Sequence, residues 1–169
     1  QLLADHMIQR MNLSASDGPQ KYKIFFLTVF LLQAQLVAKW LSFGFVHGVM
    51  NTDNMSIMGE TIDYGPCAFI DVYDPLAVFS SIDQHGRYAY MRQVEIAQWN
   101  LARLAETMLE LFSELIDESK EFANQELHHF IQLFQSEWFQ LMSKKIGFVS
   151  SLQDSGADKI WQLIIDLLE

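Results

Sequence analysis

The chain has 169 residues, of which half are hydrophobic, so it is long and apolar enough to form one packed domain and is not a disordered polypeptide. Its formal net charge is -10 and its only adjacent basic pair is Lys144-Lys145, which argues against nucleic acid as a partner. The single cysteine, Cys67, excludes an internal disulfide and favours a protein of a reducing, intracellular compartment.

The first part of the sequence predicts two helices. Residues 2–11 have a helical pattern, and Ser16-Asp17-Gly18-Pro19 then supplies a break with capping residues. A long helix is expected from Gln20 to about Ser42, because this stretch lacks glycine and proline and is apolar nearly all round in its first half; Gly44 would end it. The most apolar run, 24–32, is interrupted by Thr28 and is too short to span a bilayer, so no membrane segment is expected.

The sequence changes character between Phe43 and Gln93, where most of the glycines and two of the three prolines lie among Asn, Asp and Tyr residues. We expect the functional site in this region. Within it, residues 55–58 and 61–63 predict two short strands around a turn, with Asn54 and Asp63 at the open ends of the hairpin.

Helical periodicity resumes at Val94, and three more helices are expected. The second runs from about Ser119 to Lys145, and the last from about Ala157 to Leu168. The stripe expected to face the core in the first consists of Ile96, Asn100, Leu104, Met108, Leu111 and Leu115.

The segment from His47 to Asn54 resembles the catalytic loop of protein kinases, H-R-D-x-x-x-x-N, and Asp63-Tyr64-Gly65 stands where the kinase D-F-G would be. Val49 occupies the position of the catalytic aspartate and cannot accept a proton. Either the kinase is inactive, or the one carboxylate of the loop, Asp53, is the base. Asn54 and Asp63 offer the oxygen ligands that Mg²⁺ prefers.

A longer match is more specific. The stretches 44–57 and 61–66 (GFVHGVMNTDNMSI and TIDYGP), together with DVYDP at 71–75, GRYAY at 86–90 and WNLARLA at 99–105, are similar to the SelO family, also called YdiU. The sequence departs from that family's pattern at Cys67-Ala68, where Phe-Gly is expected, and at Val94, where proline is expected. These departures concern loop packing more than the metal ligands.

The resemblance implies a pseudokinase-like enzyme that transfers AMP from ATP to Ser, Thr or Tyr hydroxyls of substrate proteins. Asp53 would be the proton acceptor, while Asn54 and Asp63 would hold Mg²⁺, with Mn²⁺ as an alternative, and Asp63 would contact ATP through the metal. The implied fold is mainly α, a protein-kinase-like C-terminal lobe with a short β-hairpin at the metal site. The location implied is cytoplasmic in a bacterium, or mitochondrial in a eukaryote.

Nothing before His47 resembles the amino-terminal lobe of a kinase. Residues 1–169 are therefore expected to be a single C-lobe domain of a longer protein, as the start at Gln1 without an initiator methionine also suggests, and to be inactive or nearly so alone. The expected partners are ATP and protein substrates, with no nucleic acid and no membrane. A kinase-like phosphotransferase and a non-catalytic helical scaffold remain alternative functions.

Several residues in the same region have plainer interpretations. His47 is expected to be a buried structural histidine, and Cys67 a small packed residue. Arg87 and Tyr88 could engage a protein substrate, although a structural ion pair is as good an explanation for Arg87. The aspartates expected to be solvated loop residues are Asp71, Asp74 and Asp83.

Overall fold

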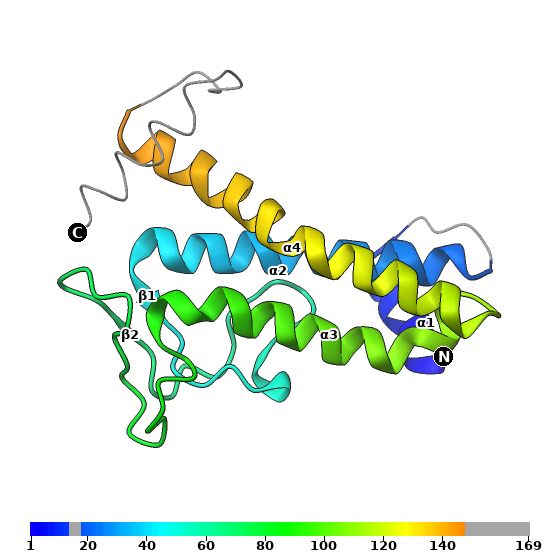
Figure 1. Ribbon diagram of the computed structural model, residues 1–169, viewed down its shortest axis with the longest axis horizontal. Coiled ribbons are helices and arrows are strands. Elements are labelled where there is room, and N and C mark those ends of the chain that lie inside the picture. Colours follow the sequence, from blue (N-terminus) through cyan, green and yellow to red (C-terminus); the bar gives the residue numbers. More distant parts are fainter. Residues whose placement is uncertain (14–17, 148–169) are drawn as a thin grey trace.

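The computed structural model describes residues 1–13 and 18–147, which form a mainly α-helical fold (Figure 1). The predicted mainly α class is confirmed for this part of the chain, whereas the helix expected at 157–168 lies outside the described residues. The helices are α1 (Leu2–Arg10), α2 (Gln20–Phe43), α3 (Gln93–Phe112) and α4 (Ile116–Lys145), with short 3-10 helices at Thr52–Asn54 and Tyr90–Arg92. The strands are β1 (Phe45–Val46) and β2 (Ala68–Phe69).

The core lies where α2, α3 and α4 pack against one another, and α2 contacts both of the other long helices (Figure 1). Phe26 of α2 is fully buried between the rings of Phe112 and Phe122, at centroid distances of 5.4 and 6.2 Å. One turn further on, Phe30 meets Phe130 edge-to-face at 5.2 Å. These aromatic contacts explain why α2 is apolar nearly all round, since each side of it faces a neighbour.

Helix α2 ends where the sequence predicts. Gly44 adopts a left-handed conformation (φ 71°) and donates its N–H to the Leu41 carbonyl, the usual role of a glycine after a helix. By length and composition, however, α2 as a whole could cross a membrane, with a mean hydropathy of 1.7 over its most apolar 18 residues. The prediction of no membrane segment considered only residues 24–32, which are a part of this helix. In the 18-residue window, 61% of the residues are buried inside the fold, as in a core helix.

The other helices follow the predictions with shifts at their ends. Ile96 and Met108 of α3 are buried as expected, but Leu115 is 61% exposed because α3 already ends at Phe112 and Ser113 is extended. Helix α4 begins at Ile116, slightly earlier than predicted, and ends at Lys145 as predicted.

The expected hairpin is wrong in its extent. Only one bridge forms, between Met55 and Thr61, and the regular two-stranded antiparallel sheet is instead β1 with β2, pairing Phe45 with Phe69 and Val46 with Ala68. Side chains replace a ladder beyond the bridge: Ser56 Oγ accepts the N–H of Met58, and Gln33 Nε2 donates to the Ser56 carbonyl. The β1–β2 pair therefore closes the base of the loop that carries the candidate site.

Candidate functional site

The candidate site lies on the loop formed by residues 47–67, between β1 and β2; its two arms are the segments before and after the turn at residues 56–60. His47 lies directly after β1, is fully buried, and joins the two arms of this loop. Its Nδ1 accepts the N–H of Val49 at 3.4 Å, so in the neutral ring the proton resides on Nε2, which donates to the Ile62 carbonyl at 2.8 Å. The rings of Trp40 and Phe45 cover the imidazole. The prediction of a structural histidine is confirmed, and its bond to Ile62 fixes the residue just before Asp63.

Gln93 holds the same loop from the opposite side and was not identified from the sequence. It is the first residue of α3 and fully buried; its Oε1 accepts the His47 N–H at 2.9 Å. Its Nε2 donates to the carbonyls of Phe45 (2.9 Å) and Tyr90 (3.1 Å). One side chain thus satisfies three buried backbone groups, and the only sequence sign was a polar residue at the start of an apolar helix face.

Asn54 ends the short helix Thr52–Asn54, and its side chain is oriented by the loop itself. Its Nδ2 donates to the Val49 carbonyl at 3.1 Å, and because a carbonyl can only accept, the amide nitrogen must face it. Oδ1 therefore points to the other side, and no hydrogen bond to it occurs among the described residues. An amide oxygen held in this way fits a Mg²⁺ ligand.

Asp63 is exposed and adopts a left-handed backbone conformation with φ 54°, one of two non-glycine residues to do so in the described ranges. Such a conformation costs roughly 1–2 kcal/mol for most residues, less for Asp and Asn, and commonly marks functional positions. The Asp63 carboxylate forms no ion pair with any described residue. It is free to bind a cation.

Asp53 lies on the exposed face of the same short helix as Asn54, and it too has no ion-pair partner in residues 1–13 and 18–147. The Met55–Thr61 bridge joins the two arms of the loop one residue after Asn54 and two residues before Asp63. Together with the His47–Ile62 bond, it brings the three predicted residues to the same end of the loop.

The segment that precedes α3 is tied to this loop. The Asp83 carboxylate accepts the N–H groups of Arg87 and Tyr88, both at 2.8 Å, and the Tyr88 hydroxyl donates to Asn51 Oδ1 at 2.5 Å. Asp83 is thus a turn-forming residue, as is Asp74, whose carboxylate accepts the Leu76 N–H. A groove of about 900 Å³ lies between Val49 and Asn51 on one side and residues 82–96 on the other.

Arg87 differs from one of its predicted explanations. No ion pair forms to it in the part of the chain that the structure describes; its guanidinium lies over the Trp99 ring, 4.8 Å from the centroid. Cys67 agrees with prediction, because it is half-buried, packs against the core and donates its thiol to the Tyr64 carbonyl at 3.3 Å.

Tyr90 links the segment before α3 to the end of α2. Its side chain is buried and its hydroxyl donates to the Leu41 carbonyl near the end of α2, at 2.5 Å. Burial raises the pKa of the Tyr90 phenol to about 12, because the charged phenolate would lose its hydration. Tyr90 therefore remains a neutral hydrogen-bond donor over the physiological pH range.

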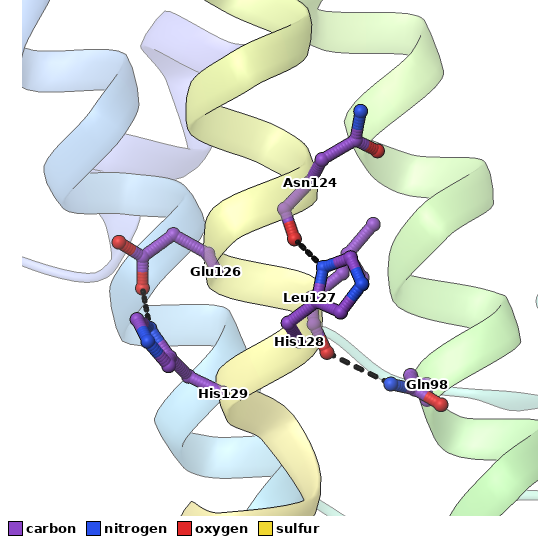
Figure 2. Close-up of polar contacts among 6 residues, drawn as sticks. All are labelled: Gln98, Asn124, Glu126, Leu127, His128 and His129. Atoms are coloured by element: carbon purple, nitrogen blue, oxygen red, sulfur yellow. Dashed lines mark hydrogen bonds and ion pairs between the residues drawn. The ribbon is translucent and has the colours of Figure 1, made fainter.

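The adjacent histidines of α4 each contact a different residue of their own helix. Figure 2 shows His128 and His129 pointing to different sides of the helix, with His128 Nδ1 donating to the Asn124 carbonyl at 2.6 Å and His129 Nδ1 4.0 Å from the Glu126 carboxylate. Gln98 of α3 donates to the Leu127 carbonyl beside them and so links the two helices. Across the described ranges, no three His, Cys, Asp or Glu side chains converge on a point.

Comparisons with known proteins agree with the motif reading. A family model described as protein adenylyltransferase SelO matches residues 1–169. Among curated relatives, each named protein nucleotidyltransferase YdiU, the Methylorubrum populi protein is 54% identical over 88% of this chain, and the Rhizobium meliloti protein 49% over 96%. The Mycolicibacterium smegmatis protein is 46% identical over 99%. The chain covers 30 to 34% of these relatives' lengths. This chain belongs to the SelO family.

Proposed function

We propose that this chain carries the metal ligands and the base of a protein adenylyltransferase, which moves AMP from ATP to Ser, Thr or Tyr hydroxyls of other proteins. One observation carries the proposal. The loop is held by buried hydrogen bonds through His47, while Asp53, Asn54 and Asp63 present side-chain oxygens at its surface that have no partner among the described residues.

In the proposed reaction, Asn54 and Asp63 hold Mg²⁺, or Mn²⁺, which when bound neutralises charge on the triphosphate of ATP. The Val49 carbonyl orients Asn54, and the His47–Ile62 bond positions Asp63. The substrate hydroxyl oxygen forms a bond to the α-phosphorus, the bond from that phosphorus to the bridging oxygen of the β-phosphate breaks, and pyrophosphate leaves. The Asp53 carboxylate takes the hydroxyl proton.

The remainder of the ATP site is proposed to lie in parts of the protein that this chain does not include. A net charge of -10 repels a nucleotide unless basic residues and metal oppose it, and the relatives are about three times longer than the chain. This supports our proposals that the chain is one domain, the C-terminal lobe of a kinase-like fold, and that it is nearly inactive alone. The bacterial relatives support a cytoplasmic protein.

Protein substrates are proposed to approach through the groove beside Asn51. It adjoins the Val49 side of the loop and contains side chains of both charges, including Asp83, Arg87 and Glu95, as suits a polypeptide surface. Neither a nucleic acid nor a membrane is a proposed partner. Phosphotransfer is the second candidate, but Val49 in place of the usual base disfavours it.

The decisive experiment uses the intact protein that contains this chain, a protein acceptor, Mg²⁺, and ATP labelled at either the α- or the γ-phosphate. Label from the α position is expected on the acceptor, with a mass increase of one AMP, and Asp53→Ala should reduce transfer by roughly 10²–10⁴-fold, the usual contribution of a general base. Asp71→Ala, also at an exposed aspartate of the region, is the control and should retain activity.

If only label from the γ-phosphate appears on the acceptor, the reaction is phosphotransfer and the proposal of AMP transfer is wrong. Full activity of Asp53→Ala would remove Asp53 as the base while leaving nucleotidyl transfer standing. Loss of metal-dependent ATP binding in Asp63→Ala, but not in Asp71→Ala, is expected if Asp63 holds the metal.

A further inference from the structure

Three exposed aromatic residues lie together beside the candidate site. Phe43 is the last residue of α2, Phe69 belongs to β2, and Tyr64 follows Asp63 along the chain. They are 64%, 64% and 62% exposed, in that order, and all three line one pocket of about 200 Å³. We call these three residues the aromatic surface. The proposed reaction makes no use of it.

The inner lining of this pocket is held by packing within the fold. Trp40 and Phe45 are each only 5% exposed, and their ring centroids are 5.6 Å apart. Phe45 also meets the Phe69 ring edge-to-face at 5.3 Å. Trp40 Nε1 donates to Thr61 Oγ1 at 2.8 Å, which ties α2 to the loop. The pocket is therefore preformed, and a side chain that enters it meets a lining that is already ordered.

The size and chemistry of the pocket suit one large apolar side chain. Small-molecule sites usually measure about 300–1,000 Å³, so this pocket is smaller than most of them. Its lining is mostly aromatic, and among the described residues Lys39 is the one charged member. Well-packed pockets of this kind receive the anchor residues of protein interfaces.

The exposure of the aromatic surface indicates that another segment covers it in the intact protein. Neighbouring aromatic residues left in water form the apolar patches that mark contact surfaces, because their large rings are stabilised by burial. Within the described residues, Lys145 at the end of α4 places its amine 4.2 Å from the Phe43 ring centroid. This contact still leaves Phe43 64% exposed, so the described part of the chain leaves the surface open.

The length of the relatives favours a part of the same polypeptide as the occupant. The chain covers 30 to 34% of these relatives, so about two thirds of their length has no counterpart in it. In the proposed function, that remainder supplies the basic residues of the ATP site. A domain that reaches a triphosphate on a metal at Asp63 also approaches the next residue, Tyr64, and the pocket that Tyr64 lines.

We propose that the aromatic surface is the contact face for the part of this protein that lies outside residues 1–169, and that this part inserts a large apolar side chain between Phe43, Tyr64 and Phe69. The choice of occupant rests on the proposed function, because the ATP site is what brings the two parts together. The contact fixes how the rest of the ATP site lies over Asp63.

The test puts the photo-crosslinking residue p-benzoylphenylalanine in place of Phe69 in the intact protein, so that one aromatic side chain replaces another. After irradiation of the purified protein, peptide mass spectrometry should find a crosslink within one polypeptide, from position 69 to a segment outside residues 1–169. The same replacement of Phe43 is the second probe and should reach the same segment. Far-UV circular dichroism first establishes that each variant is folded.

Leu115 is the matched control position. It is apolar and 61% exposed, but it lies between α3 and α4, at the opposite end of the molecule from β1 and β2 (Figure 1). The crosslinking residue in place of Leu115 should not reach the segment that positions 43 and 69 reach.

Four results would overturn the proposal: no crosslink from either probe in folded protein, a crosslink only to residues 148–169, a crosslink between two copies, or an equal yield from position 115. The measurement needs neither ATP nor an acceptor protein. Crosslinking without transfer of α-label would therefore leave the contact standing and remove adenylyl transfer, whereas transfer without crosslinking would do the reverse.

Discussion

The strongest structural prediction concerns Gln93, whose amide satisfies the His47 N–H and the carbonyls of Phe45 and Tyr90 in a fully buried position. In Gln93→Leu the side chain keeps approximately the same size and leucine is also a good helix former, but all three backbone groups lose their hydrogen-bond partner. Each buried group left unsatisfied costs about 1–3 kcal/mol, and partial relaxation is expected, so we predict a loss of about 3–6 kcal/mol in the free energy of unfolding.

A loss of that size is a large share of the ~5–15 kcal/mol that stabilises a typical domain. Urea unfolding of the intact protein, followed by tryptophan fluorescence, measures it through the shift in midpoint of the transition that reports this domain. Gln132→Leu, an identical change at an exposed site on α4, is the control and should change stability by less than about 0.5 kcal/mol. If Gln93→Leu costs less than about 1 kcal/mol, the three-bond arrangement does not hold the loop.

Three further predictions follow from backbone conformation and burial. Gly59→Ala should destabilise the protein by more than Gly147→Ala, because both glycines have positive φ (68° and 88°) but only at Gly59 would a Cβ lie 2.9 Å from Leu32; equal losses of unfolding free energy would contradict this. The raised pKa of Tyr90 means that only the unfolded phenol ionises between pH 10 and about 12, so stability should fall with rising pH by at most about 1.4 kcal/mol per unit. Tyr90→Phe should lack this fall in urea titrations at pH 9 and 11.5, and a parallel decline in both proteins would refute it. Asp63→Asn should keep the fold, since Asn also tolerates the left-handed conformation. We expect Mg²⁺ with a non-hydrolysable ATP analogue to raise the melting temperature of the intact wild-type protein and to have no such effect on Asp63→Asn.

Local patterns in the sequence were sufficient to place the four helices of the described residues. The ends of α2 could be predicted from a stretch without glycine or proline and from Gly44 after it, because helix formation depends on neighbours along the chain. Leu115 shows the limit of that reasoning: helical spacing alone extended the core stripe past the residue where α3 ends.

For the candidate site, too, the sequence predicted some features and the folded loop decided others. Motif spacing alone selected Asp53, Asn54 and Asp63, and the structure places them at one end of the loop through the Met55–Thr61 bridge. Spacing could not show that the Asn54 amide is turned by the Val49 carbonyl, or that Asp63 takes a left-handed conformation. Both depend on the way in which the loop folds back on itself.

Sequence by itself determined the mainly helical class, the position of the loop and the residues proposed as metal ligands and as the base, because these are properties of short stretches. Only the tertiary structure decided how the loop is held and what lies beneath it. The Gln93 bond to His47 joins residues 46 apart, and Asn100 reaches Met50 from a distance of 50 residues. Contacts of that kind arise from packing α2 and α3 around the loop, and no pattern along the chain encodes which amide meets which carbonyl.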